Sequence, residues 1–156
     1  MPDSGFYARE VILEYKMNPV LLSAKSPHYA TPSSLYDQLD AEFHFNFDPC
    51  PYNEEYHGPL FSFDGLNVSW ANKRVFCNPP YGRAITRFMM KAIEADLAVF
   101  LVPARVDTAW FHDLALPHAK EIRFLRGRLK FEGCKNSAPF PCMLVIFKFG
   151  LDKQAG

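Results

Sequence analysis

The chain has 156 residues, of which 49% are hydrophobic, and its 17 Lys and Arg residues balance 17 Asp and Glu residues. This length fits one domain with one core, because each of two half-sized domains would lie near the lower limit of independent stability. The hydrophobic fraction excludes disorder of the body of the chain. The neutral balance excludes binding to nucleic acid through overall charge, so a local basic patch would have to serve.

Several other classes of protein are disfavoured. Charged residues or prolines interrupt every apolar run before it reaches the roughly 18 residues that a membrane-spanning helix needs, so we expect no membrane contact. The four cysteines form no CxxC pair and follow no secretory signal, which favours reduced thiols in the cytoplasm. The five histidines show no HExxH pattern and no paired spacing with the cysteines, so we expect no metal site.

The amino-terminal segment shows no clean periodicity. We predict an arm or extension over residues 1–25, followed by a single domain over residues 26–156. A short amphipathic helix is expected at the start of this domain, since Thr31 can cap a helix and Pro32 suits its first turn. Helical spacing of apolar residues continues at Leu35, Tyr36 and Leu39.

Two predicted strands end in unusual turns. Alternation of Phe43, Phe45 and Phe47 indicates a strand that ends at the turn Asp48–Pro49–Cys50–Pro51. Downstream, the apolar run Val75–Cys77 stops at Asn78–Pro79–Pro80–Tyr81, whose prolines cannot continue a sheet ladder. Because ligands sit beyond the carboxyl ends of strands in open α/β sheets, these two turns are the places to look for a site.

The second half of the chain alternates helix and strand. Helical spacing over residues 85–93 leads to the apolar run 97–102, which stops at Pro103 and is typical of a buried parallel strand. Strand, helix and strand imply a crossover unit. Two later strands, near residues 122–125 and 143–149, suggest an antiparallel hairpin at the sheet edge. The sequence therefore predicts an α/β fold with a mostly parallel sheet flanked by helices.

The tetrapeptide Asn78–Tyr81 suits chemistry on the exocyclic amine of adenine, a poor nucleophile whose lone pair is delocalised into the ring. The Asn78 side-chain oxygen and the Pro79 carbonyl could each accept an amine hydrogen and draw the lone pair toward an incoming methyl group. Pro79 and Pro80 fix φ, and the Tyr81 ring offers a stacking face. An isolated Asn-Pro-Pro is also an ordinary turn, but the following Tyr after an apolar strand favours catalysis.

These residues, in this order, resemble those of phage-type, Dam-like DNA N6-adenine methyltransferases, and the likeness extends from about Tyr29 to Phe149. The motifs that carry it stand at Thr31–Pro32, Asp48–Pro49–Cys50–Pro51, Asp64–Gly65–Leu66, Asn78–Tyr81 and Leu101–Val102–Pro103. The resemblance implies a reduced Rossmann-like methyltransferase sheet, S-adenosyl-L-methionine as cofactor, and DNA whose target adenine is flipped out of the duplex. It also implies the cytoplasm of a bacterial host and a phage or prophage origin.

The resemblance also implies roles for single residues. Catalysis falls to Asn78, Pro79, Pro80 and Tyr81, while Tyr81 and Phe140 flank the target base. The residues implied in cofactor binding are Thr31, Pro32, Asp48, Pro49, Cys50 and Asp64. Asp48 and Asp64 can equally be plain turn residues. The chain lacks the usual Gly-rich turn and a second strand-helix unit, so either Glu54 or Glu55 could hold the cofactor ribose, or both are solvated.

Basic residues follow the predicted strand ends and suit the binding of DNA phosphates. The residues assigned to DNA are Arg83, Arg105, Arg126, Arg128 and Lys130, with Arg87 and Arg123 nearby. Two alternatives stay open: methylation of RNA adenine or protein glutamine by the same tetrapeptide, and a catalytically silent module that binds nucleic acid or protein. Phe140 favours DNA, since an aromatic there would flank a flipped base. Target recognition would fall to loops, the arm or a second subunit, and a homodimer is possible.

Overall fold

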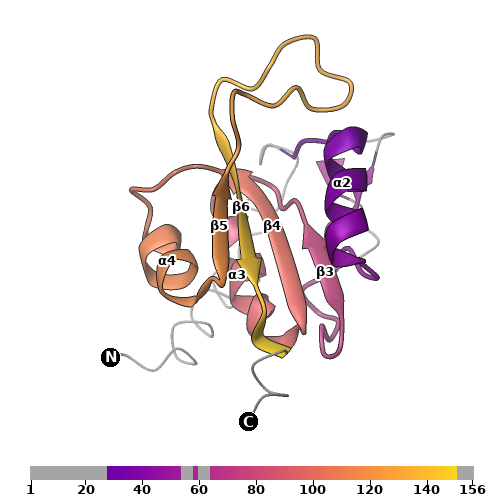
Figure 1. Ribbon diagram of the computed structural model, residues 1–156, viewed down its shortest axis with the longest axis vertical. Coiled ribbons are helices and arrows are strands. Elements are labelled where there is room, and N and C mark those ends of the chain that lie inside the picture. The colour runs from indigo at the N-terminus through magenta and orange to yellow at the C-terminus, as the bar shows by residue number, and fades with distance from the viewer. Residues whose placement is uncertain (1–27, 54–57, 60–63, 151–156) are drawn as a thin grey trace.

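The computed structural model describes residues 28–53, 58–59 and 64–150 (Figure 1). The predicted arm over residues 1–25 lies outside these residues. Among the helices of the described part, none is both long and apolar enough to cross a bilayer.

The core of the protein is a sheet of four strands in the order β3-β4-β6-β5. Every residue of β4 (Leu97–Pro103) and β6 (Cys142–Phe147) is buried, as expected for apolar runs that are covered on both faces. Their outer neighbours are β3 (Arg74–Cys77) and β5 (Glu121–Phe124). The strand predicted at residues 97–102 is thus confirmed, with Pro103 as its last residue.

The prediction of a mostly parallel sheet is wrong. β3 and β4 run parallel, but β6 is antiparallel to both of its neighbours, β4 and β5. β5 therefore runs in the same direction as β4 but lies one strand away, and the returning β6 fills the gap between them. The expected hairpin is present, with β5 at the edge. With this hairpin, antiparallel strand pairs outnumber parallel ones in the sheet. Among the described residues, the chain before β3 adds no further parallel strand to the sheet.

Phe43–Phe47, predicted as a strand, contributes only a single bridge. α2 (Ser33–Phe43) extends through Phe43, and His44 ends it in the left-handed conformation with φ of 54°. Phe47 then pairs in parallel with Val75, and its carbonyl accepts a hydrogen bond of 3.1 Å from Phe76 N. This pairing carries the following residue, Asp48, to the carboxyl end of β3.

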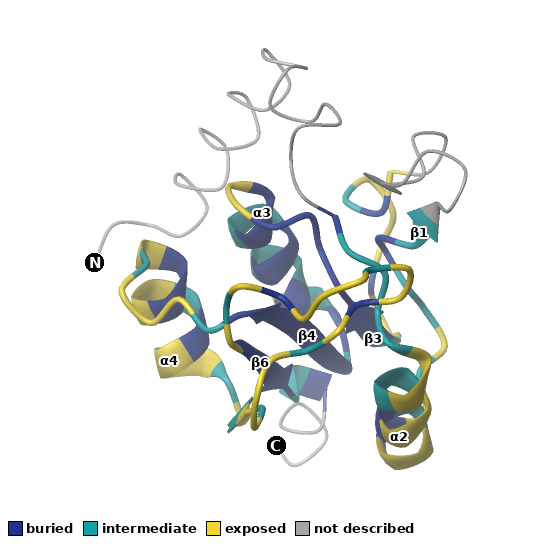
Figure 2. Ribbon diagram, turned by 90° about the horizontal axis from the view of Figure 1, so that it is seen from above, coloured by how far each residue is buried: buried dark blue, intermediate teal, exposed yellow. Residues whose placement is uncertain are grey.

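Helices cover both faces of the sheet. α2 lies on the face turned toward the viewer in Figure 1, and α3 (Ala84–Lys91) lies on the opposite face, as the view from above shows (Figure 2). Tyr36 of α2 meets Phe76 of β3 edge to face, with ring centroids 5.2 Å apart. The helix predicted over residues 85–93 is confirmed as α3 and the adjoining 3₁₀ turn η2 (Ala92–Glu94).

The remaining elements lie at the margins of the sheet. The π-helical turn η3 (Phe111–Ala115) continues into α4 (Leu116–His118), which lies beside β5 in Figure 1. β1 (Tyr52–Asn53) and β2 (Gly58–Pro59) form a separate antiparallel ribbon that follows the turn at Asp48.

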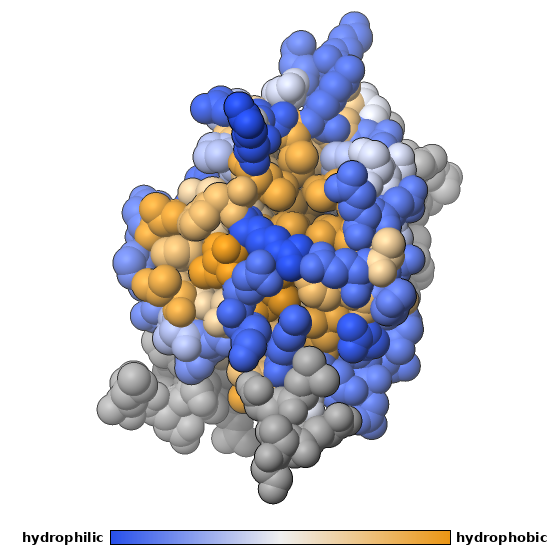
Figure 3. Space-filling model, viewed as in Figure 1, coloured by the Kyte–Doolittle hydropathy of each residue, from blue (hydrophilic) through white to orange (hydrophobic). Residues whose placement is uncertain are grey.

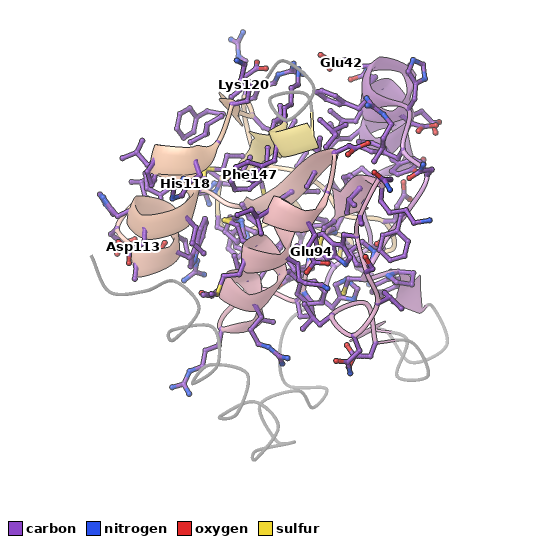
Figure 4. All side chains as sticks on the ribbon, turned by 90° about the horizontal axis from the view of Figure 1, so that it is seen from below. Glu42, Glu94, Asp113, His118, Lys120 and Phe147 are labelled. Carbon is purple, nitrogen blue, oxygen red and sulfur yellow. The ribbon has the colours of Figure 1, made fainter. Side chains whose placement is uncertain are left out.

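Arg123 of β5 ties the edge of the sheet to the end of α2. Its guanidinium donates two hydrogen bonds of 2.7 Å to the carboxylate of Glu42, which is labelled on α2 in Figure 4, and one of 2.7 Å to Glu121. The same group lies 5.3 Å from the centroid of the Phe43 ring. Hydrophilic side chains cross the apolar middle of this face in Figure 3. Arg123 was grouped with the phosphate-binding residues, but these contacts assign it to the fold.

Replacing Arg123 by alanine should lower the free energy of unfolding by about 1–2 kcal/mol, because a bidentate ion pair and a cation–π contact are lost together. The expected loss of stability is small because 32% of the Arg123 side chain is exposed, and solvent screens its charge. Urea denaturation measures the change. Arg126→Ala, on an exposed loop, is the matched control and should change stability by less than about 0.5 kcal/mol. Equal losses in the two variants would contradict the structural role of Arg123.

Candidate active site

Asn78 directly follows β3 and leaves only 4% of its surface exposed. Its amide nitrogen Nδ2 donates to the Tyr29 carbonyl at 2.7 Å and to the Thr31 hydroxyl at 3.0 Å. Because a main-chain carbonyl can only accept, Nδ2 must face Tyr29, and the amide oxygen Oδ1 points away. This Oδ1 is buried and has no hydrogen-bond partner among the described residues. A buried acceptor without a partner is unfavourable and is suited to a ligand that donates.

His28 supports the main chain of the same residue. Its Nε2 lies 2.9 Å from the Asn78 carbonyl oxygen and, since that oxygen only accepts, Nε2 is the donor. The His28 ring also lies 3.8 Å from the Cys50 sulfur and has its centroid 5.3 Å from that of Tyr52. His28 thereby links the turn that begins at Asp48 to the tetrapeptide.

A cavity of about 470 Å³ lies beside Asn78. Small-molecule sites commonly enclose about 300–1,000 Å³, so this cavity has the size of a ligand site. Three acidic residues line it, namely Asp37, Asp48 and Glu132. The aromatic residues Tyr36, Tyr52 and Phe76 line it as well. Carboxylates combined with aromatic rings suit a ligand that carries both a positive charge and a flat ring system.

Four residues of the predicted site meet at this cavity, namely Thr31, Asp48, Cys50 and Asn78. Burial raises the pKa of Asp48 to about 6, although a hydrogen bond of 2.8 Å from Cys50 N partly offsets the effect. Asp48 is therefore mostly ionised at neutral pH, in surroundings that penalise its charge. Burial and the Asp48 charge raise the pKa of the Cys50 thiol well above its ordinary value, so Cys50 stays neutral.

The predicted cofactor residues Pro32, Pro49 and Asp64 do not line this cavity. Pro32 precedes the first residue of α2. Asp64 accepts hydrogen bonds from Leu66 N at 3.0 Å and from Asn67 Nδ2 at 2.6 Å, which are ordinary turn contacts. A cofactor role for these three residues stays a prediction. Glu54 and Glu55, the candidates for the ribose, lie outside the described residues.

Gly65 packs the Asp64 turn against the Asp48 turn. A Cβ at Gly65 would collide with the Pro49 carbonyl, so only glycine allows this approach. The Gly65 carbonyl in turn accepts a hydrogen bond of 2.8 Å from the indole nitrogen of Trp70, which is fully buried. Asp64 is thereby held one residue away from the contact with Pro49.

An aromatic cluster encloses Tyr81. The Tyr81 ring lies 5.7 Å from Phe140, 6.2 Å from Phe131 and 5.5 Å from Tyr29, measured between centroids. Phe140 is thus brought to the tetrapeptide, where the resemblance places it. Tyr81 is only 5% exposed, and burial raises its pKa well above the ordinary value. Its hydroxyl has no partner within the described part of the chain.

The long loop between β5 and β6, residues 125–141, is fixed to the segment before α2. Glu132 N donates to the Ala30 carbonyl at 3.0 Å, and the Glu132 carboxylate accepts from Ser33 N at 2.7 Å. Phe131 stacks on Tyr29 with centroids 4.8 Å apart. The loop therefore contributes both to the cavity and to the aromatic cluster, and much of it is exposed in Figure 2.

All five residues assigned to DNA are exposed. In residues 28–53, 58–59 and 64–150, no ion pair involves any of them. Arg126, Arg128 and Lys130 lie on the β5–β6 loop, just before Phe131, whereas Arg83 precedes α3 and Arg105 follows β4.

The described residues bring no three metal-binding side chains together.

Comparison with known proteins identifies the family. Residues 20–149 match the family model described as DNA N-6-adenine-methyltransferase (Dam). The chain belongs to this family. The predicted resemblance is thereby confirmed, and the Dam family indicates DNA adenine methyltransferase activity. Comparison with curated proteins and with solved structures finds no match.

Sequence reasoning missed several residues that the structure places at the site. They are His28, Tyr29, Tyr36, Asp37, Tyr52 and Glu132. His28 and Tyr29 lie just before Thr31–Pro32, and this position next to a motif was the one signal that could have found them. Glu132 stands far away in the sequence on a long loop, so no local pattern could connect it to the cavity.

Proposed function

We propose that this member of the Dam family transfers a methyl group from S-adenosyl-L-methionine to the N6 amine of adenine in DNA, with Asn78–Tyr81 as its catalytic loop. One observation carries the proposal. The Asn78 amide oxygen is buried without a partner among the described residues, beside a cavity of ligand size. An exocyclic amine is a donor that would satisfy this oxygen.

The chemistry of the cavity wall fits the proposed cofactor. Asp37, Asp48 and Glu132 would hold its positively charged part, and the rings of Tyr36 and Tyr52 would contact its flat adenine. When bound, S-adenosylmethionine supplies the methyl group that ends on the target nitrogen. The raised pKa of Asp48 supports this role, because a bound cation offsets the unfavourable burial of its charge.

The catalytic loop acts through fixed acceptors and needs no strong base. Asn78 Oδ1 and the Pro79 carbonyl each accept one amine hydrogen, which favours a pyramidal nitrogen and counters the positive charge that develops on it. Asn78 remains neutral throughout. The surplus amine proton leaves to water once the new bond to nitrogen has formed.

The target base enters beside Tyr81. Because Tyr81 is only 5% exposed, a flipped adenine can stack there only after an aromatic neighbour moves aside. Phe131 and Phe140 both belong to the β5–β6 loop, so displacement of this loop would open the site. The loop also carries Arg126, Arg128 and Lys130, which would bind phosphates as the base enters. One chain supplies all these residues, so the proposed reaction in the bacterial cytoplasm needs none of them from a second copy of the chain.

Asn78→Ala should slow single-turnover methylation of adenine on the order of a hundredfold or more, because one preorganised transition-state partner is lost. DNA affinity should change little. The rate is measured at saturating DNA and S-adenosylmethionine, with folding checked by circular dichroism. Tyr81→Phe is the matched control: it keeps the aromatic ring on which the base would stack, so the rate should stay near that of wild type. A wild-type rate in Asn78→Ala would show that the loop is a structural turn.

Cofactor affinity should rise from pH 5 to pH 7 and then level off, because Asp48, with a pKa of about 6, is protonated below this range and ionised above it. Only the ionised form attracts a cationic ligand. Calorimetry with S-adenosylmethionine measures the trend. His28 also lines the cavity, so the variant Asp48→Asn is needed to assign the pH dependence to Asp48. This variant should bind S-adenosylmethionine more weakly and should lose most of the increase in affinity between pH 5 and pH 7. A full rise in Asp48→Asn would assign the effect to His28 or to another group.

Replacing Arg126 and Arg128 together by alanine should weaken DNA binding by a similar factor for all sequences. The slope of log affinity against log salt should fall by about one unit per lost phosphate contact. Fluorescence anisotropy over a series of salt concentrations measures this slope. Lys120→Ala, an exposed cation at the opposite end of β5 from the loop, is the control. An unchanged slope in the double variant would place the DNA path elsewhere on the surface.

A further inference from the structure

The orientation of the Asn78 amide depends on a short segment that precedes α2. The amide nitrogen has two hydrogens and two acceptors, the Tyr29 carbonyl at 2.7 Å and the Thr31 hydroxyl at 3.0 Å. His28, from the same segment, donates to the Asn78 main-chain carbonyl at 2.9 Å. Residues 28–31 thus hold Asn78 through its main chain and through its side chain.

We propose that Thr31 is a positioning residue for methyl transfer, whose hydroxyl fixes the Asn78 amide with Oδ1 directed at the target amine. The inference rests on the proposed function. It differs from the role in cofactor binding that the resemblance implies for Thr31, because the contact that supports it is with the catalytic side chain.

The Tyr29 carbonyl and the Thr31 hydroxyl have different effects on the orientation of the Asn78 amide. The Tyr29 carbonyl decides which end of the amide faces it, since an oxygen at 2.7 Å from this carbonyl would be repelled. It leaves the amide plane free to swing about that single hydrogen bond. The Thr31 hydroxyl accepts the second hydrogen and fixes the plane. Acceptors that stabilise developing charge act well only when they are held in place beforehand, so this second contact sets the efficiency of Asn78.

The backbone around Thr31 is stiff enough for this task. A residue before proline is restricted to extended conformations, so Pro32 limits the movement of Thr31. The neighbouring residues are fixed from the other side by Glu132, which bonds to the Ala30 carbonyl and to Ser33 N. Thr31 is therefore held between two anchored residues while its hydroxyl reaches Asn78.

The test compares Thr31→Val, which keeps the shape but removes the acceptor, with Thr31→Ser, which keeps the hydroxyl. Thr31→Val should slow single-turnover transfer on the order of tenfold at saturating S-adenosylmethionine and DNA, and Thr31→Ser should recover most of the rate. The dissociation constant for S-adenosylmethionine, from calorimetry, should stay within about twofold of wild type in both. A weaker affinity with an unchanged saturated rate would overturn the proposal and make Thr31 a cofactor ligand.

A second readout does not depend on catalysis. The side-chain amide resonances of Asn78, assigned in ¹⁵N spectra by their loss in Asn78→Ala, report whether both hydrogens are bonded in the wild-type protein. Slow exchange with water is expected in wild type and Thr31→Ser, and fast exchange of one hydrogen in Thr31→Val. Fast exchange of both hydrogens in the wild type would overturn the proposal even if Thr31→Val failed to fold. If the amide were protected but no DNA were methylated, the proposed function would fail while the contact stood.

Discussion

The site depends on one constraint: a buried amide whose nitrogen is fully engaged and whose oxygen is left open. Asn78 Nδ2 donates to Tyr29 and Thr31, while Oδ1 has no partner among the described residues. Most buried acceptors in folded proteins have a hydrogen-bond partner, so this open oxygen is suited to a ligand that donates. The orientation is not a free choice of rotamer, because reversal would set two oxygens against each other. The fold therefore fixes the polarity of the site before any ligand arrives.

The sheet explains how separate motifs reach this amide. Phe47 pairs with Val75 in parallel, and this brings Asp48 to the strand end from which Asn78 extends. The β5–β6 loop returns over the same end and packs Phe131 and Phe140 on Tyr29 and Tyr81. The cavity, the tetrapeptide at residues 78–81 and the basic β5–β6 loop thus share one edge of the molecule. Movement of the loop would affect both ligands, since it carries Glu132 to the cavity and Phe140 to the tetrapeptide.

The sequence predicted the local features well and the long-range pairing poorly. Apolar runs stopped by proline located β3 and β4, and helical spacing located α2 and α3, because these signals depend on neighbouring residues. The direction of β6 depends on which strand it meets across the sheet, and no local pattern records that. The same limit applies at the site. Thr31 was associated with the cofactor through its motif, whereas its bond to Asn78 joins residues 47 positions apart.

The central claim is that this site methylates the N6 amine of adenine in DNA. The direct test incubates the purified protein with S-adenosylmethionine labelled on its methyl group and duplex DNA of mixed sequence. The DNA is then digested to nucleosides and separated by chromatography, with RNA and protein substrates in parallel reactions. The account predicts that the label appears in N6-methyladenine from DNA. Label confined to cytosine, RNA or glutamine, or no transfer by a protein that binds the cofactor, would contradict it.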